Sequence, residues 1–221
     1  MFKAILFDMD GTLVDTEPCG IKTLQVIQDL HKLNITTEDY NFFDKVWRRV
    51  GTEVEFDEYM TSICNKSNFD KAEIVKEEFF DEYKKQIRQA QPLPGAEELL
   101  TYLQELNIPT ALVSASYTDQ IMEVVKEHNW QQFFSEVVGL DQYKEKKPSP
   151  KGYLLAATKL DVSISECCVV EDSEAGIKSG KNAGGFVIAV KAGQQTTPQN
   201  TEEADQTLGN LVDVKNYLAS L

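Results

Sequence analysis

Short apolar runs that alternate with segments of helical periodicity constrain the fold of this chain more than any other feature. Strands that alternate with helices form βαβ units, which place the strands parallel in one sheet and join them by right-handed crossovers. The sequence therefore predicts an α/β fold with a Rossmann-like parallel sheet core and helices on both faces. The predicted strands are residues 2–7, 110–116, 135–140, 167–172 and 186–190.

The long segment between the first two predicted strands has a different texture. Its apolar residues recur at helical spacing, its charge is dense, and it contains no convincing strand. We therefore expect an inserted α-helical cap domain over residues 17–90, and a catalytic core made of residues 1–16 and 91–221. Near the end of the chain we expect a polar surface loop over residues 192–207 and a closing helix over residues 211–221.

Charge and hydropathy limit the partners that this chain can have. With 36 acidic and 22 basic residues, the formal net charge is −14, which would repel nucleic acid and anionic membrane surfaces. No stretch approaches the roughly 20 consecutive apolar residues that a membrane span needs, and no signal-peptide pattern precedes the first strand. We expect a cytoplasmic monomer whose partner is a small molecule.

The four cysteines form no metal-binding pattern. Without a CxxC pair or a Cys/His array, a zinc site is not expected. Cys167 and Cys168 are adjacent on a predicted strand, where successive side chains point to opposite faces. We therefore expect reduced thiols, with one of these two cysteines in the core.

Polar residues follow three of the predicted strands. Asp8 and Asp10 follow the first, Ser114 lies at the end of the second, and Glu171 with Asp172 closes a later one. In open parallel sheets, ligands bind beyond the carboxyl ends of the strands, so these groups should meet at one edge. A single aspartate there would fit an ordinary turn cap, but converging carboxylates need a cation. Hard oxygen ligands favour Mg²⁺ over zinc.

Positive charge for the same edge comes from the segment "KEKKPSP". The proline in this segment favours an extended loop. We expect Lys147, beside the proline, to point inward, whereas Lys144 and Lys146 belong to a solvated basic run. The Ser114 hydroxyl and the backbone amides that follow it are suited to holding phosphate oxygens.

With these residues identified, the sequence resembles the haloacid dehalogenase-like hydrolase superfamily. The segments "DMDGTLVDTE", "VSAS", "KKPSP" and "VVEDSEAGI" are similar to its four motifs, in the family's order and spacing. The resemblance covers residues 2 to about 190 and is closest to the phosphatase and β-phosphoglucomutase branch. It implies a magnesium-dependent phosphatase that hydrolyses a small phosphorylated metabolite, such as a sugar phosphate, through an aspartyl-phosphate.

The resemblance also implies roles for the residues around the nucleophile. Asp8 would be the nucleophile. Asp10 would be the general acid and base, with a pKa raised toward neutrality, and its backbone carbonyl would bind the metal. Lys147 would neutralise charge on Asp8 and on the phosphate, so that Lys147 and Mg²⁺ together keep Asp8 ionised.

For the remaining core motifs, the resemblance implies phosphate and metal binding. Ser114, Ala115 and Ser116 would hold the transferring phosphoryl group. Asp172 would be the main metal carboxylate besides Asp8, with Glu171 binding the metal directly or through water.

The insertion resembles the mobile cap of this branch, where closure excludes water and adds substrate contacts. Residues 15–18 and 90–94 would be its hinges. The candidate substrate contacts in the cap are Glu17, Arg49, Gly51 and Thr52, although a solvated basic helix face explains the arginine equally well.

Two departures favour a phosphatase over a β-phosphoglucomutase-type phosphomutase, which remains the alternative. The mutases carry a cap histidine shortly after the Asp–Thr pair, where this chain has Pro18, Cys19 and Gly20. Their cap arginine is also unmatched, since Val54 stands near its place. Carbon–halogen hydrolysis, which needs no metal, is a further alternative, and Asp10 with the Glu171–Asp172 pair argues against it. A non-catalytic metabolite-binding module is another alternative, which only an assay excludes.

Overall fold

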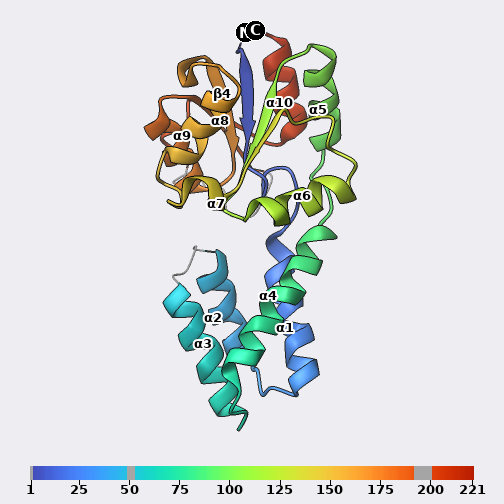
Figure 1. Ribbon diagram of the computed structural model, residues 1–221, viewed down its shortest axis with the longest axis vertical. Helices are drawn as coiled ribbons and strands as arrows, with labels where there is room; N and C mark the ends of the chain where they lie inside the picture. Colours follow the sequence, from blue (N-terminus) through green and yellow to red (C-terminus); the bar gives the residue numbers. More distant parts are fainter. Residues whose placement is uncertain (1, 49–52, 192–200) are drawn as a thin grey trace. The chain divides into compact units, whose positions relative to one another are not determined.

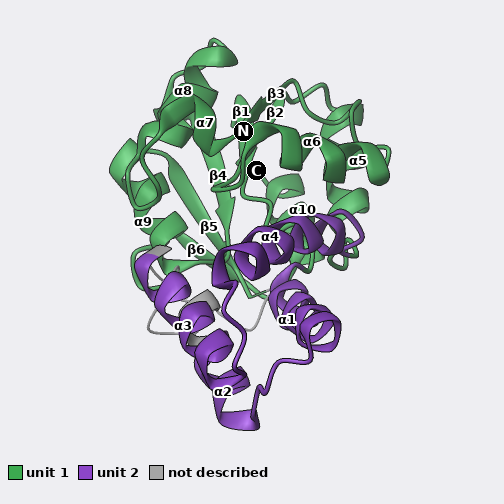
Figure 2. Ribbon diagram, turned by 60° about the horizontal axis from the view of Figure 1, so that its bottom comes forward, with its two compact units in different colours: residues 1–15, 91–221 green, residues 16–90 purple. Residues whose placement is uncertain are grey.

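The computed structural model describes residues 2–48, 53–191 and 201–221. The chain forms two compact units, one made of Met1–Asp15 with Gln91–Leu221 and the other of Thr16–Ala90 (Figure 2). The first unit is α/β, and the second is a helical cap region inserted into it. The two units are described in turn.

A six-stranded, all-parallel sheet forms the centre of the first unit, with strand order β3-β2-β1-β4-β5-β6. This confirms the predicted fold class. β5 has its predicted bounds and the other four predicted strands are shorter; β2 and β4 end earlier than predicted because the polar residues Ser114 and Asp172 lie beyond the ladder. Their bounds are β1 (Ala4–Phe7), β2 (Thr110–Val113), β3 (Glu136–Val138), β4 (Cys167–Glu171), β5 (Phe186–Val190) and β6 (Gln206–Leu208).

Strand β6 begins within the segment 192–207 that the sequence predicts to be a loop, so that prediction is wrong for residues 206 and 207. β6 pairs in parallel with the edge of β5, and Asp205 anchors its start by accepting a hydrogen bond from the Val187 N–H at 2.7 Å. Its side chains are mostly exposed. An edge strand of three residues with exposed side chains carries no apolar alternation that would mark it in the sequence.

Helices cover both faces of this sheet (Figure 1). Helices α8 and α9 contact each other and β1 to β5 on one face, while α5 contacts α10 on the other. The helices of this unit are α5 (Ala96–Glu105), α6 (Thr118–Glu127), α7 (Leu140–Tyr143), α8 (Lys151–Lys159), the 3₁₀ helix η1 (Ile164–Glu166), α9 (Glu174–Ala183) and α10 (Leu211–Ala219).

The central strands are buried on both faces, because each face carries helices. Every residue of β1, β2 and β4 is buried. Cys167 and Cys168 are therefore both in the core, as free thiols, and not only one of them as expected from the alternation of a strand. Burial raises the pKa of the Cys168 thiol well above its usual range, which keeps this sulfur protonated and unreactive.

The chain leaves the first unit and returns to it through paired segments. The Asp15 N–H donates to the Gln91 carbonyl at 2.9 Å, and the Leu93 N–H donates to the Leu13 carbonyl at 2.8 Å. An isolated bridge also joins Val14 to Pro92. These backbone bonds hold the two ends of the insertion side by side, although they are far apart in the sequence.

The second unit is a small helical domain with its own core. Its elements are α1 (Glu17–His31), α2 (Thr37–Arg48), α3 (Glu53–Lys66) and α4 (Ala72–Arg88). Buried aromatic rings pack at its centre, where the centroid of Phe79 lies 5.1 Å from that of Phe56 and 5.7 Å from that of Phe43. Not every apolar residue of α1 enters this core: Leu24 and Ile27 are buried, whereas Leu30 is 61% exposed.

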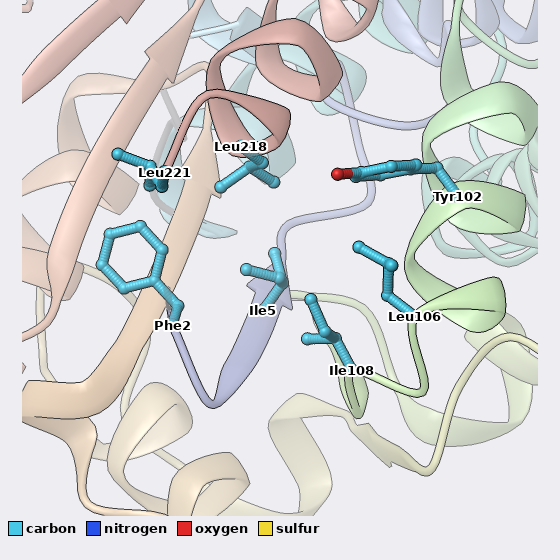
Figure 3. A pocket seen from close by; sticks show the side chains of 7 residues that line it. All are labelled: Phe2, Ile5, Tyr102, Leu106, Ile108, Leu218 and Leu221. Atoms are coloured by element: carbon cyan, nitrogen blue, oxygen red, sulfur yellow. The ribbon is translucent and has the colours of Figure 1, made fainter.

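A small apolar pocket lies at the amino end of β1, away from the strand ends that carry the carboxylates (Figure 3). Its volume of about 10 Å³ leaves room for about one water molecule, so it holds no substrate. The residues that line it are Phe2, Ile5, Tyr102, Leu106, Ile108, Leu218 and Leu221. Within the described ranges, no helix combines the length and the apolar character that crossing a bilayer requires.

The approach of α9 to the sheet yields the first prediction. A Cβ atom at Gly180 would lie 2.8 Å from Val187 Cγ2 and 3.1 Å from Val169 Cγ1, inside van der Waals contact. Gly180→Ala should therefore lower the free energy of unfolding by about 1–3 kcal/mol, as overpacked cores do. Urea unfolding measures this change. The control, Lys178→Ala on the same helix, should cost less than about 0.5 kcal/mol, and equal losses in both variants would contradict close helix–sheet packing at Gly180.

Candidate active site at the carboxyl ends of the strands

The register of the sheet brings polar residues from three strands to one edge. Phe7 pairs with Leu112 on one side and with Val170 on the other. The residues that follow these strands, Asp8, Ser114 and Asp172, are all buried. One ligand oxygen from each of Asp8, Glu171 and Asp172 lies within 4.8 Å of the other two, so the described residues contain one group of carboxylates able to hold a metal ion.

Lys147 connects this carboxylate group to the sheet. Its Nζ donates to Asp8 Oδ1 at 2.5 Å, to Glu171 Oε1 at 2.6 Å and to the Val113 carbonyl at 3.2 Å. The Lys147 side chain is only 9% exposed, while Lys144 and Lys146 are exposed. The lysine that the sequence placed at the site is thus the one whose ammonium is inside it.

Glu171 is surrounded by hydrogen-bond donors. Its Oε1 accepts from Lys147 and, at 2.9 Å, from the hydroxyl of Tyr153. Its Oε2 accepts from the backbone N–H of Asp172 at 3.0 Å, and from the N–H and the hydroxyl of Ser173, each at 3.1 Å. A Cβ atom at Gly176 would lie 1.7 Å from Oε1, so only glycine leaves room for this carboxylate beneath α9.

Asp172 is held from the turn that follows β1. Its Oδ1 accepts a hydrogen bond from the Thr12 hydroxyl at 3.0 Å. Gly11 adopts a φ of 81°, which side chains with a Cβ rarely tolerate, and a Cβ there would lie 2.4 Å from Asp172 Oδ2. The glycine and threonine behind Asp10 thus shape the turn around this carboxylate.

The carboxylate of Asp10 faces the loop after β2. Its Oδ2 accepts hydrogen bonds from the Ser114 hydroxyl at 2.8 Å and from the Ser116 hydroxyl at 3.5 Å. The Ser116 N–H donates to Ser114 Oγ at 3.0 Å, and Ala115 between them is exposed. Tyr143 donates from its hydroxyl to the Ser114 carbonyl at 3.0 Å. Asp8 and Asp10 therefore contact different partners: Asp8 accepts from the Lys147 ammonium, and Asp10 accepts from the serine hydroxyl groups.

The predicted cap residues stand apart from this group. Glu17 begins α1 in the unit of residues 16–90, and its contact with substrate stays a prediction. Arg49, Gly51 and Thr52 lie outside the described residues, so their predicted roles also stay predictions.

The electrostatics of the core site follow from its burial. The pKa of Asp8 is raised to about 8, and burial is the largest cause. The charges of Glu171 and Asp10 also raise this pKa, whereas the Lys147 ammonium lowers it without cancelling the rise. Burial, with the charges of Asp8 and Glu171, likewise raises the pKa of Asp172 well above its usual range. Burial alone would lower the pKa of Lys147, but Asp8 and Glu171 raise it well above its usual value, so this lysine stays charged.

A divalent cation fits this site. The carboxylates supply hard oxygen ligands of the kind that Mg²⁺ and Ca²⁺ take, and one buried lysine does not balance their charge. The pKa of Asp8 stands at about 8 with Lys147 already in contact, so the ammonium does not offset the effect of burial on this carboxylate. A second positive charge beside Asp8 and Asp172 would remove this penalty.

Several residues at the site carried no clear signal in the sequence. Tyr153 lies on the apolar stripe of α8, so its pattern marks only a core residue. Tyr143 belongs to a helix of four residues that the sequence did not predict. Thr12 and Gly176 lie within the quoted motifs, but their contacts with Asp172 and Glu171 depend on the fold.

Comparison with known proteins places this chain in a family. The model of a family described as haloacid dehalogenase-like hydrolase matches residues 5–190, most of the chain. Hexitol phosphatase A of Escherichia coli is 30% identical over 96% of this chain and 93% of that protein. A bifunctional riboflavin kinase/FMN phosphatase of Arabidopsis thaliana is 29% identical over 96% of this chain, which spans only 54% of that longer protein.

Solved structures show the same fold. The β-phosphoglucomutase of Clostridium difficile superposes with a TM-score of 0.74 and 24% sequence identity, covering 100% of this chain and 96% of that one. At this level of identity the similarity concerns the fold alone.

The raised pKa of Asp8 yields a prediction for metal binding. A bound cation must displace the proton that Asp8 holds below about pH 8, so Mg²⁺ affinity should rise by up to about tenfold per pH unit below that pH and level off above it. Calorimetric titration of the ion-free protein from about pH 6 to pH 9, in buffers of different protonation enthalpy, measures both the affinity and the protons released.

The same shift sets the sign of the stability change in the ion-free protein. In the folded protein the pKa of Asp8 is raised from its ordinary value of 3.8 to about 8. Its contribution to the free energy of unfolding is therefore fully present below pH 3.8 and is lost as the pH rises through about 8. The control Glu145→Gln, at an exposed carboxylate paired with Lys151, should leave the pH dependence of Mg²⁺ binding unchanged. Equal Mg²⁺ affinity at pH 6 and pH 8 would mean that Asp8 is already ionised without the cation.

Proposed function

Because this chain belongs to the haloacid dehalogenase-like hydrolases, in the branch of capped phosphatases and β-phosphoglucomutases, we propose that it is a magnesium-dependent phosphatase acting through an aspartyl-phosphate on Asp8. The family match and the similarity to a phosphatase along nearly the whole chain identify it as a phosphoric monoester hydrolase. The metal, the covalent intermediate and the substrate, a small phosphorylated metabolite of the sugar phosphate class, are what we propose beyond the enzyme class.

One observation carries the proposal: a buried ammonium contacts the aspartate that begins the first motif, at an edge with two more carboxylates and a serine loop. Catalysis of phosphoryl transfer depends mainly on an in-line nucleophile and on neutralised charge at the equatorial oxygens of the phosphoryl group. Asp8 supplies the attacking oxygen. Lys147 supplies a fixed positive charge next to that oxygen, at the position where the transferring group arrives.

Asp10 is suited to proton transfer, because its carboxylate accepts hydrogen bonds from the hydroxyl groups of Ser114 and Ser116. In the first step its proton goes to the departing ester oxygen while Asp8 bonds to phosphorus. In the second step the Asp10 carboxylate takes a proton from the water that attacks the aspartyl-phosphate, which releases inorganic phosphate and restores Asp8. Ser114 orients Asp10 and offers its own hydroxyl to the phosphoryl oxygens.

Asp8, Asp172 and the backbone carbonyl of Asp10 would hold Mg²⁺, with Glu171 binding it directly or through water. When bound, this cation neutralises charge on the transferring phosphoryl group and lowers the proton affinity of Asp8. The fit rests on the hard oxygen donors and on the excess of buried carboxylate described above.

Water is the proposed phosphoryl acceptor, because the cap offers no histidine near the hinge. The chain has two histidines, and His31 interacts with Glu78 and lies edge-on to the ring of Phe69 inside the helical unit. The position after the Asp–Thr pair is instead occupied by the first turn of α1, where Cys19 and Gly20 are buried. The names of the relatives, a hexitol phosphatase and an FMN phosphatase, support a phosphomonoester of a polyol or sugar.

A panel assay tests the proposed function. Purified protein is incubated with p-nitrophenyl phosphate, hexose and hexitol phosphates and FMN, with Mg²⁺ or with EDTA. We expect release of inorganic phosphate that EDTA abolishes. Activity that EDTA leaves unchanged would overturn the metal assignment. Conversion of a hexose 1-phosphate to its 6-phosphate in the presence of a bisphosphate activator, without free phosphate, would identify a mutase.

Asp8→Asn tests the nucleophile. An amide does not attack phosphorus, so kcat should fall by about a million-fold, as it does when nucleophiles are removed from other enzymes. The melting temperature of the ion-free protein at pH 7 should change little, because the pKa of Asp8 is about 8 and the neutral amide resembles its protonated form. Turnover near the wild-type rate, in a preparation free of wild-type enzyme, would remove Asp8 from the mechanism.

Asp10→Asn separates proton transfer from nucleophilic attack. Loss of a general acid should slow the first step by about a hundred- to ten-thousand-fold for a sugar phosphate, whose alkoxide leaves poorly. The first step with p-nitrophenyl phosphate should slow far less, because this leaving group needs no proton, and aspartyl-phosphate should accumulate on Asp8. Burst kinetics and mass spectrometry after an acid quench measure both effects. Equal losses of first-step rate for the two substrates would contradict the proton-transfer role.

A further inference from the structure

Tyr153 makes more contacts with the charged centre than its place on an apolar helix stripe requires. It is fully buried in the first turn of α8, its hydroxyl donates to Glu171 Oε1 at 2.9 Å, and its ring lies 5.0 Å from Lys147 Nζ. From this geometry we infer that Tyr153 is a positioning residue, whose hydroxyl and ring together keep the Lys147 ammonium on Asp8 and moderate the charge that Glu171 presents to a cation. This inference rests on the proposed phosphatase function.

The hydroxyl of Tyr153 competes with Lys147 for one oxygen. Both donate to Glu171 Oε1, at 2.9 Å and 2.6 Å. Two donors that share one carboxylate oxygen each carry partial positive charge and repel each other, so the oxygen holds each donor less strongly than it would hold one alone. The Tyr153 hydroxyl therefore weakens the hold of Glu171 on Lys147, and more of the ammonium's interaction remains with Asp8 Oδ1.

The ring of Tyr153 closes the remaining side of the ammonium. Lys147 Nζ has three N–H donors, and its three acceptors are Asp8, Glu171 and the Val113 carbonyl. At 5.0 Å, the aromatic ring lies within the range of a cation–π interaction. The three acceptors and the aromatic face together restrict the position of the ammonium.

Gly152, the residue before Tyr153, helps to set the position of Tyr153. A Cβ atom at Gly152 would lie 3.0 Å from Val113 Cγ1 and 3.2 Å from the ring of Tyr143. Glycine at this position lets the start of α8 approach β2 closely. Tyr153 thereby reaches the edge where Val113 ends β2 and Glu171 ends β4.

Removing only the hydroxyl should have two effects of opposite direction. Glu171 Oε1 would lose one donor, draw Lys147 away from Asp8, and lower kcat. The same loss leaves more negative charge on Glu171 for a cation, so Mg²⁺ should bind more tightly. A residue that only filled the core would change stability without strengthening metal binding.

The experiment compares Tyr153→Phe and Tyr153→Leu with wild type and with the control Thr110→Val. Thr110 starts β2 at the opposite edge of the sheet, and its buried hydroxyl donates to the Phe133 carbonyl, so its valine variant loses a buried hydrogen bond far from the carboxylates. For each protein, kcat and KM on one phosphomonoester, the Mg²⁺ dissociation constant by calorimetry without substrate, and the melting temperature are measured.

In Tyr153→Phe we expect kcat to fall about tenfold, as when outer-shell partners are lost. We expect KM to stay near wild type, and the Mg²⁺ dissociation constant to fall about fivefold, the effect of one typical hydrogen bond. Tyr153→Leu should lose more kcat, because the ring is also gone. Thr110→Val should lower only the melting temperature.

Unchanged kcat and Mg²⁺ affinity in Tyr153→Phe, or weaker Mg²⁺ binding in step with a lower melting temperature, would overturn the inference. If wild type hydrolyses no phosphomonoester, the proposed function fails. The Mg²⁺ titration then still decides the role of Tyr153, because tighter binding in the phenylalanine variant supports it and unchanged or weaker binding overturns it.

Discussion

The ion pair between the Lys147 ammonium and the carboxylates of Asp8 and Glu171 is the interaction on which the rest of this site depends. All three groups are buried where the parallel strands end. Burying a charge is unfavourable unless it is paired and hydrogen-bonded. The first unit meets this requirement by bringing a loop lysine, a strand-end aspartate and a strand-end glutamate together, with the Val113 carbonyl as a further acceptor for the ammonium.

Backbone geometry makes this concentration of charge possible. Gly11 and Gly176 stand where a single methyl group would collide with the carboxylates of Asp172 and Glu171. The N–H groups that follow β4 donate to Glu171, so part of the stabilisation comes from the main chain. Backbone donors fixed by the fold are preorganised, and electrostatic preorganisation supplies a large share of the rate enhancement of many enzymes.

The charge balance of the ion-free site is incomplete. Lys147 pairs with two carboxylates, yet the pKa of Asp8 is about 8 and that of Asp172 is raised well above its usual range. Sequence reasoning expected Lys147 and a cation to keep Asp8 ionised together, and the raised pKa of Asp8 beside Lys147 supports the need for that second positive charge. In the proposed mechanism, metal binding therefore also prepares the nucleophile. Asp10 adds to the negative charge around Asp8, while its own carboxylate accepts a hydrogen bond from the Ser114 hydroxyl.

The sequence by itself determined the α/β class, the family and the edge at which the polar residues gather, because strand and helix periodicity and residues such as Asp8 and Lys147 are local signals. It did not reveal β6, whose exposed residues form a strand only against the edge of β5. Nor did it reveal the burial of both Cys167 and Cys168. The contact of Tyr153 with Glu171 joins α8 to the end of β4. Tertiary structure alone decided it, since an apolar stripe fixes that a side chain is buried but not which polar atom its hydroxyl meets.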